Sequence, residues 1–256
     1  MNYSTPMQHA SAVRGLKKIS AAALGALALM SAAPAMADVI DFESQLPDIF
    51  MGGMTFEEHG FTLLVQDTLA AGGGNGFAGA LVNGLDPYSC GVAVCPSGNS
   101  SIYFMSVNDG SVQMSLSMAN GQGFRLSGLD YGFMVPVGGL PAGILPGKLT
   151  ILGEKVGGGT VSTEVEFAAL DGSGSSPFLH ATLASQFAAT TFSSVQFSSC
   201  LYDGVGGCSV YGNQSQFAID NIEVAAVPEP QTYAMMGLGL AAIGLLSRRR
   251  RASHNV

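Results

Sequence analysis

The chain has 256 residues and a formal net charge of −8. Seven of its ten basic residues lie in the two terminal segments, so residues 38–225 carry seventeen acidic residues against three basic ones. A stretch this acidic is repelled by the phosphates of nucleic acids and by anionic lipid headgroups, so we expect no nucleic-acid partner. The length allows one or two domains, each large enough to bury a hydrophobic core.

The first 37 residues have the three parts of a secretory signal peptide. These are a basic n-region, an apolar h-region and an A-x-A cleavage site: Arg14, Lys17 and Lys18; Ile19–Met30; and Ala35–Met36–Ala37. The pattern predicts an exported protein whose mature chain begins at Asp38. A retained N-terminal anchor is the alternative, which the short h-region and the well-formed cleavage site disfavour.

Residues 38–225 are predicted to form one all-β domain. Apolar and polar residues alternate along short segments, most clearly in 112–118 and 160–168, and such alternation places one face of a strand on a core and the other in water. The predicted strands are Val39–Phe42, Phe61–Gln66, Ile102–Val107, Val112–Met118, Phe124–Leu129, Phe133–Val137, Lys148–Gly153, Thr160–Ala168, Val195–Phe197 and Phe217–Val224. The fold class that follows is a two-sheet, jelly-roll-like β-sandwich.

Turn-forming residues separate these segments. Asn108–Asp109–Gly110 lies between two predicted strands and indicates a β-hairpin. A short helix is expected within Leu183–Ala189. Glu57–Glu58–His59 lacks the spacing of a helical zinc motif, so His59 is expected to be a surface residue.

Four cysteines, all within residues 38–225, agree with export to an oxidising compartment. We predict two local disulfides, Cys90–Cys95 and Cys200–Cys208, because each would close a small loop that contains turn residues. A zinc site is the alternative. The C-x4-C and C-x7-C spacings depart from those of common zinc motifs, however, and no histidine lies beside either pair.

The two ends of this domain carry a short family resemblance. The domain opens with Val39–Glu43, which contains D-F-E, and closes with Phe217–Val224, which contains I-D-N. The pairing resembles the first and last strands of carbohydrate-binding-module-like jelly rolls, which implies that these two strands lie close together. A sugar-binding face normally uses flat aromatic side chains. The domain has no tryptophan, so the candidates are Tyr88, Tyr103, Tyr131, Tyr202 and Tyr211.

The last predicted strand changes its apolar face. Phe217 and Ile219 share one face, whereas Ile222 and Val224 share the other, so a bulge or twist is expected between them. If the terminal strands are adjacent, Asp220 comes close to Glu43 at that point.

Two carboxylates beside a core repel each other unless a cation or hydrogen bonds stabilise them. We therefore predict a structural calcium ion bound by Glu43 and Asp220, with oxygens of Asn221 or Asp41. The alternative is that Asp220 and Asn221 hydrogen-bond to the backbone within the bulge. No other cofactor is expected.

The domain shows no complete catalytic motif. Glu164 and Glu166 lie on one face of a predicted strand, whereas a glycosidase needs two carboxyl groups that face each other across a cleft. The domain is therefore predicted to be non-catalytic, and a hydrolase with an unrecognised site is the alternative.

The C-terminal residues 226–252 consist of three parts. Val227–Pro228–Glu229–Pro230 is expected to be extended, because the two prolines fix φ and remove two N–H donors. Tyr233–Leu246 carries no charge and is rich in small residues, as membrane helices are, although it is shorter than the ~20 residues of a typical span. Together with a basic stop that would stay on the cytoplasmic side, it predicts a transmembrane helix. The stop consists of four arginines: Arg248, Arg249, Arg250 and Arg251.

These three parts, in this order, resemble the sorting tail of PEP-CTERM proteins, with Pro228–Glu229–Pro230 as the signature. The resemblance implies that an exosortase, a sorting protease, recognises the tail. It also implies that the protein is first anchored in the cytoplasmic membrane and then reaches the cell surface or the extracellular matrix. The hypotheses for residues 38–225 are a non-catalytic surface or matrix protein, a module that binds exopolysaccharide or another glycan, and a hydrolase.

Overall fold

A computed structural model describes residues 37–67, 76–86, 89–91, 93–107, 112–136, 138–204, 207–209, 216–227 and 237–244. The chain divides into two compact units, Ala37–Pro228 and the terminal segments Met1–Met36 with Glu229–Val256. In the second unit only residues 237–244 are described, and they form an exposed helix. Within the described part of the chain, no helix has the length and apolar character needed to cross a membrane.

Several parts of the predicted terminal signals lie outside the described residues. They include the signal peptide up to Met36, with Ala35 of its cleavage site, and the signature Pro228–Glu229–Pro230. The four arginines of the predicted membrane stop also lie outside the described residues: Arg248, Arg249, Arg250 and Arg251. Their roles therefore stay predictions from the sequence.

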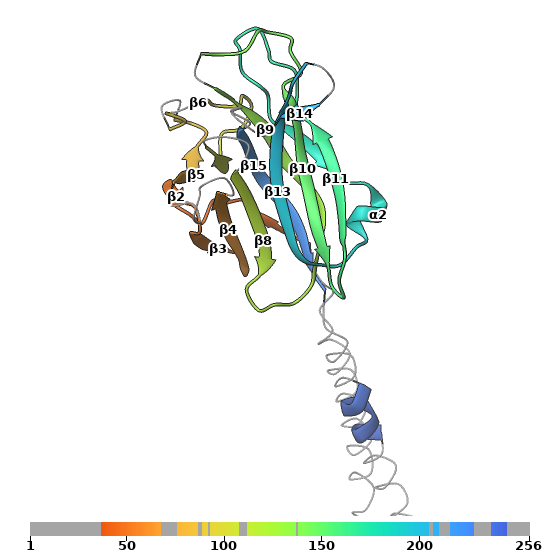
Figure 1. Ribbon diagram of the computed structural model, residues 1–256. Helices are drawn as coiled ribbons and strands as arrows, with labels where there is room; N and C mark the ends of the chain where they lie inside the picture. The colour runs from red at the N-terminus through yellow and green to blue at the C-terminus, as the bar shows by residue number, and fades with distance from the viewer. Residues whose placement is uncertain are drawn as a thin grey trace, which may run out of the picture. The chain divides into compact units, whose positions relative to one another are not determined.

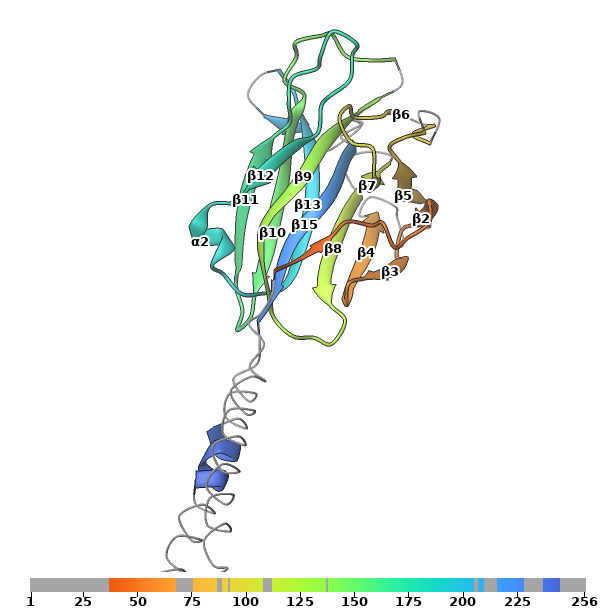
Figure 2. The same ribbon diagram turned by 180° about the vertical axis from the view of Figure 1, so that it is seen from behind.

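The unit Ala37–Pro228 is an all-β sandwich of antiparallel strands (Figures 1 and 2). The first sheet has the order β2 (Asp48–Met51), β5 (Phe77–Asn83), β7 (Ile102–Ser106), β15 (Gln216–Ala226) and β9 (Phe124–Pro136). The short strand β1 (Ala37–Ile40) also pairs with β15, and β6 (Ala93–Val94) and β12 (Leu179–Thr182) pair with β9.

The second sheet has the order β3 (Thr55–Glu58), β4 (Phe61–Asp67), β8 (Val112–Met118), β13 (Phe192–Tyr202), β10 (Gly147–Lys155) and β11 (Thr160–Glu166). The short strand β14 (Cys208–Ser209) pairs with the end of β13. The two sheets are joined at one corner, where Phe192 of β13 pairs with Phe124 of β9. The predicted two-sheet β-sandwich is confirmed.

Apolar side chains of the two sheets meet in one core that is rich in phenylalanine. At the corner between the sheets, the ring centroids of Phe61 and Phe124 are 5.2 Å apart, and those of Phe124 and Phe192 are 6.4 Å apart. The short helix α2 (Ser185–Ala188) adds Phe187, whose ring lies 4.8 Å from that of Phe192. These rings therefore fill the corner where β9 of the first sheet pairs with β13 of the second.

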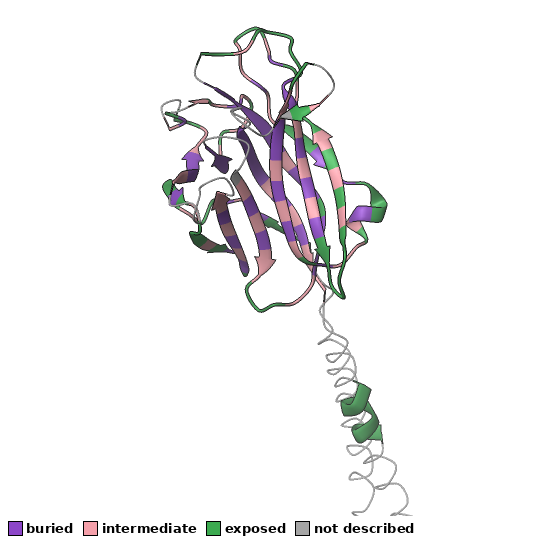
Figure 3. Cartoon of the chain, in the orientation of Figure 1, coloured by how far each residue is buried: buried purple, intermediate pink, exposed green. Residues whose placement is uncertain are grey.

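The two sheets differ in how many of their faces are covered. Buried and partly exposed residues alternate along β10 and β13 of the second sheet, as Figure 3 shows. In the first sheet, β5 is buried almost continuously, because a second apolar cluster covers its other face. Tyr103 and Met134 belong to that cluster, and the Tyr103 ring packs against Phe178 with centroids 5.2 Å apart.

Most predicted strands are present with small shifts of their ends, whereas Val195–Phe197 is only the middle of the eleven-residue strand β13. Phe124–Leu129 and Phe133–Val137, predicted as two strands, correspond to the single strand β9, which ends at Pro136, and Val137 lies outside the described residues. Gly132, within the expected break, does not mark a turn there. A side chain at this position would meet the Pro96 ring at 3.1 Å, so the glycine permits a close approach of two segments. Strands β2, β3 and β5 were not predicted, and in β5 the burial of both faces removes the alternation that would have indicated a strand.

The hairpin predicted at Asn108–Asp109–Gly110 is wrong. Strand β7 before it pairs with β5 and β15 in the first sheet, whereas β8 after it pairs with β4 and β13 in the second. The three residues themselves lie outside the described residues. A turn signal does not determine which strands pair, and here the strands before and after it belong to different sheets.

Both predicted disulfides are present, Cys90–Cys95 and Cys200–Cys208. Their Cα atoms are 5.5 Å and 5.6 Å apart, and no cysteine is free. Cys90 belongs to the apolar cluster on the outer face of the first sheet, so the first disulfide closes the segment that covers this face. The alternative of a zinc site on the cysteines is thereby excluded.

Candidate functional site

The first and last strands of the sandwich lie side by side, as the resemblance to carbohydrate-binding modules implied. Strand β1 runs antiparallel to the end of β15, with Ala37 opposite Ala225 and Ile40 opposite Ile222. On its other side β15 pairs with β9, and the register of that ladder shifts between Asp220 and Glu223. The bulge predicted from the change of apolar face is therefore confirmed, and Asn221 within it has a φ of 47°.

The bulge holds a fully buried carboxylate. Asp220 has 0% exposure, and its Oδ2 atom accepts hydrogen bonds from Asn99 Nδ2 at 2.7 Å and from Ser101 Oγ at 2.6 Å. Its Oδ1 atom accepts a third hydrogen bond from the backbone N–H of Asn221 at 2.8 Å. Both oxygens of the buried carboxylate are thus bound by donors of the chain.

Burial raises the pKa of Asp220 to about 6, even though the donors from Ser101, Asn99 and Asn221 stabilise the ionised form. Asp130, opposite Asp220 in the β9–β15 ladder, adds a like charge that raises the pKa further. Removal from water is thus the largest influence on this carboxyl group. The pKa of Tyr103 is raised as well, by burial and then by the negative charge of Asp220.

Asp130 carries a second, more exposed set of contacts. His180 Nδ1 of β12 lies 2.8 Å from its Oδ1 atom, and Asn221 Nδ2 donates to its Oδ2 atom at 2.8 Å. The side chain of His180 is 50% exposed. The contact between His180 and Asp130 could not be predicted from the sequence. The two residues are fifty positions apart, and only the pairing of β12 with β9 brings them together.

The predicted calcium ligands occupy the following places. Glu43 Oε1 accepts a hydrogen bond from the backbone N–H of Ile102 at 2.7 Å, next to Ser101, which donates to Asp220. Asp220 and Asn221 make the contacts described above. Glu43 and Asp220 are thus linked through two consecutive residues of one segment. Hydrogen bonding, the alternative to calcium, is observed for Asp220, although two of its three donors are side chains rather than backbone groups. The calcium site itself stays a prediction.

The candidate tyrosines of a sugar-binding face differ in how far they are buried. Tyr103 has 0% exposure and Tyr131 has 6%, so both are core residues. Tyr202 is half-buried, and its hydroxyl donates to Glu166 Oε1 at 3.0 Å. Tyr88 and Tyr211 lie outside the described residues. Within the described part of the chain, the tyrosines therefore form no flat exposed platform.

The paired carboxylates of β11 lie on the outer face of the second sheet. Glu164 Oε2 accepts from Lys148 Nζ at 2.7 Å, and Glu166 accepts from Tyr202. Both belong to one strand with an alternating, mostly exposed face. Their contacts are those of a solvated sheet surface.

The C-terminal segment is identified by comparison with known families. Residues 226–251 match the PEP-CTERM protein-sorting motif. The chain thus carries this motif directly after β15, and the motif indicates an exported protein that is sorted by an exosortase. Val227 is the one residue of Val227–Pro230 that the structure describes. No curated protein matches the chain.

Solved structures with a similar arrangement of strands give the class of fold. A DUF4465 family protein from Bacteroides caccae matches with a TM-score of 0.50 and 17% sequence identity, over 75% of this chain and 100% of that one. At this identity the likeness shows the fold alone. TmCBM61 in complex with β-1,4-galactotriose matches with a TM-score of 0.28 and 11% identity, over 73% and 95% of the two chains. A score this low carries no argument about the present chain.

Proposed function

We propose that this chain is a non-catalytic protein of the cell surface or extracellular matrix, delivered there by exosortase processing of its C-terminal tail. The observation that carries the proposal is the sorting motif at residues 226–251, which begins where the last strand of the sandwich ends. Two disulfides in the folded unit suit an oxidising compartment outside the cytoplasm.

The non-catalytic role is supported by the hydrogen bonds and positions of the carboxylates. Asp220 is saturated with hydrogen bonds, and Glu164 and Glu166 lie on one exposed strand rather than on opposite walls of a cleft. Glycan binding stays a prediction for the tyrosines outside the described residues, since Tyr103 and Tyr131 are buried.

Removal of Val227–Val256 tests the sorting proposal. We expect the full chain to be found first in the membrane fraction and then, processed, at the surface of a host that has an exosortase. The shortened chain should appear soluble in the periplasm or medium, because it lacks the apolar segment and the basic stop. An identical distribution of both forms between membrane and soluble fractions would show that the tail is not the anchor.

A second variant separates anchoring from processing. Replacing Pro228, Glu229 and Pro230 by alanine leaves the apolar segment and the four arginines of the stop intact, so the chain should remain in the membrane and keep its full length. Replacing the neighbouring polar residues Gln231 and Thr232 by alanine is the matched control and should leave processing unchanged. Processing of the first variant at the wild-type rate would contradict the role of the motif.

A further inference from the structure

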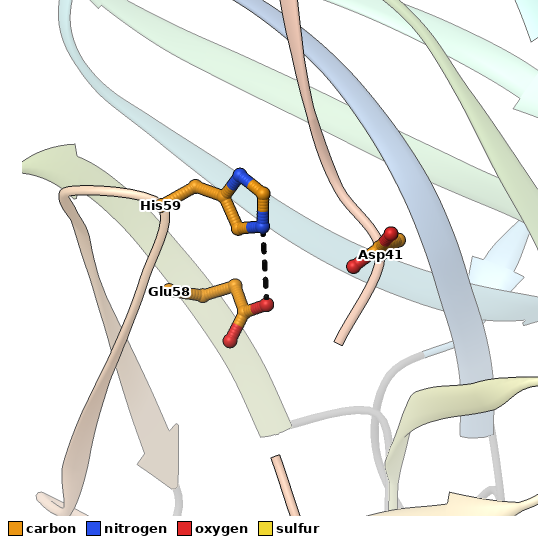
Figure 4. Close-up of side chains that lie close together, drawn as sticks. All are labelled: Asp41, Glu58 and His59. Carbon is orange, nitrogen blue, oxygen red and sulfur yellow. Dashed lines mark ion pairs between the residues drawn. The ribbon is translucent and has the colours of Figure 1, made fainter. Parts of the chain in front are cut away.

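Three side chains from two separate segments converge where β1 and β3 end, outside the hydrogen-bond network of Asp220. Asp41 follows β1, whereas Glu58 and His59 lie at the turn between β3 and β4, and Figure 4 shows the Asp41 carboxylate facing the other two. One ligand atom of each residue lies within 4.8 Å of those of the other two.

The backbone fixes this convergence. His59 and Gly60 form the two-residue connection between the paired residues Glu58 and Phe61, with φ values of 49° and 78°. Two consecutive positive φ values are those of a type I′ turn, in which histidine is an unusual choice. In the other segment Phe42, with a φ of 58°, is completely buried and anchors the chain next to Asp41.

Glu58 has one carboxylate oxygen without a donor. The residue is 2% exposed, and its Oε2 atom accepts hydrogen bonds from Ser44 Oγ and Gln45 Nε2, both at 2.6 Å. Its Oε1 atom is buried and has no hydrogen-bond partner. An ionised oxygen removed from water without a partner is costly, so this atom points to a ligand that is bound by the protein.

The ring of His59 is oriented to supply the second ligand atom. Its Nδ1 atom lies 3.1 Å from Asp38 Oδ1. Because an ionised carboxylate can only accept, this contact places a proton on Nδ1, so in the neutral form of the ring Nε2 is the nitrogen that carries the lone pair. Nε2 lies 3.6 Å from Glu58 Oε1, which is too long for a hydrogen bond. In the charged ring the two atoms form the ion pair that Figure 4 marks. In the neutral ring two electron-rich atoms face each other instead, and a cation between them would satisfy both.

We propose that Asp41, Glu58 and His59 bind a divalent transition-metal ion of the zinc type, with Asp38 orienting the imidazole. Calcium and magnesium take oxygen ligands, whereas one imidazole nitrogen with two carboxylates suits zinc and its neighbours. With bonds of about 2.0–2.2 Å, the ligand atoms of a tetrahedral zinc ion are roughly 3.4 Å apart. The Glu58–His59 pair, at 3.6 Å, is close to this spacing, and the Asp41 oxygen lies within 4.8 Å of both, so a small side-chain adjustment would bring it in.

This site shares Asp41 with the calcium site predicted from sequence, as one of its alternative ligands, but its other residues differ. Glu43, Asp220 and Asn221 are engaged with donors or acceptors of the chain, whereas Glu58 Oε1 has no donor. Sequence spacing did not reveal the zinc-type site, because Glu58 and His59 are neighbours on a β-turn rather than one turn apart on a helix. Asp38 is also the predicted first residue of the mature chain, so the orienting carboxylate lies directly at the signal-peptide junction.

The test is a titration of the full chain, solubilised in detergent and stripped with a chelator, with zinc and with calcium. We expect one zinc ion per chain, a higher melting midpoint with zinc, and a characteristic visible absorbance when cobalt replaces zinc. Glu58→Gln and His59→Asn should weaken zinc binding by about tenfold or more, and Asp38→Asn, which alters only the orienting contact, by about tenfold. His59→Asn preserves the turn, since asparagine favours positive φ.

Glu57→Gln is the matched control. It removes the same charge from the neighbouring residue of β3, whose side chain is exposed, and should bind zinc as the wild type does. The proposal is overturned if the wild type binds no zinc, or if Glu58→Gln and His59→Asn both bind it as tightly as Glu57→Gln. Equal stabilisation by calcium, lost in Glu58→Gln, would also overturn the choice of a zinc-type ion. If Glu58→Gln does not fold, the zinc affinity of His59→Asn, a substitution on the surface of the turn, still tests the proposal.

Discussion

Two buried carboxylates in this sandwich are stabilised to different degrees. Asp220, in the bulge of a central strand, receives three hydrogen bonds that occupy both of its oxygens. Glu58, at the end of an edge hairpin, receives two hydrogen bonds on one oxygen and none on the other. The first is part of the internal structure of the sheet, whereas the second has free capacity to bind a ligand. Burial of a carboxylate therefore does not by itself identify a binding site, and the count of donors distinguishes the two cases.

The largest effect in this comparison is expected from Asp220→Ala. Loss of the carboxylate leaves the Asn99 amide N–H without its acceptor and the Ser101 hydroxyl with only Asn99 Oδ1 to donate to. We therefore expect the free energy of unfolding to fall by roughly 3 kcal/mol. Chemical denaturation of the tail-deleted chain measures it. Asp48→Ala, at an exposed position of an edge strand, is the control and should change stability by less than ~0.5 kcal/mol. A cost below that of the control would mean that the Asp220 network does not stabilise the fold.

The pH dependence of stability gives a second, smaller effect. The pKa of Asp220 is raised from 3.8 to about 6 in the folded chain, so the folded state binds this proton more tightly than the unfolded state does. The resulting stabilisation is complete below the unfolded pKa and is lost as the pH rises through the folded one. We expect the stability of the wild type minus that of Asp220→Asn to fall by about 2 kcal/mol between pH 4 and pH 7. A difference that is constant with pH would show that the carboxyl group titrates normally.

The smallest effect is expected from Glu58→Gln in metal-free protein. The amide oxygen of glutamine can still accept from Ser44 and Gln45. The substitution also removes the negative charge, so the cost of burying an ionised oxygen without a donor disappears. Stability should therefore change by less than about 1 kcal/mol in the presence of chelator. Denaturation of both proteins with chelator measures this change. If Glu58→Gln were as costly as Asp220→Ala, the two carboxylates would have the same structural role, and the count of donors would not distinguish them.

Sequence patterns predicted the elements that depend on local alternation. Strand β8 has the predicted ends, Val112 and Met118, and both disulfides follow from cysteines that are close in the chain. The bulge at Asp220 was also visible, because a change of apolar face within one strand requires it. What these features share is that neighbouring residues determine them.

Contacts between distant segments were not predictable in this way. Strand β5 is buried on both faces and shows no alternation, and the turn after β7 leads into the other sheet rather than into a hairpin. The partners of Asp220 were missed for the same reason, since Asn99 and Ser101 are more than a hundred residues away. His59 was expected to be a surface residue, and it is exposed, but its contacts with carboxylates were not predicted. Its neighbours Asp38 and Asp41 are brought to it only by the pairing of β1 with β15.

The position of β15 determines how the folded unit responds to mechanical load. The chain leaves the sandwich through this strand, which is held by β9 on one side and by β7 and β1 on the other. The hydrogen bonds of an antiparallel ladder are perpendicular to the strands, so a pull that acts along β15 is perpendicular to these bonds. The bonds are therefore loaded together in shear, whereas a pull across the strands would open them one after another. A surface protein tethered at this point would resist drag with the strongest geometry that a sheet provides.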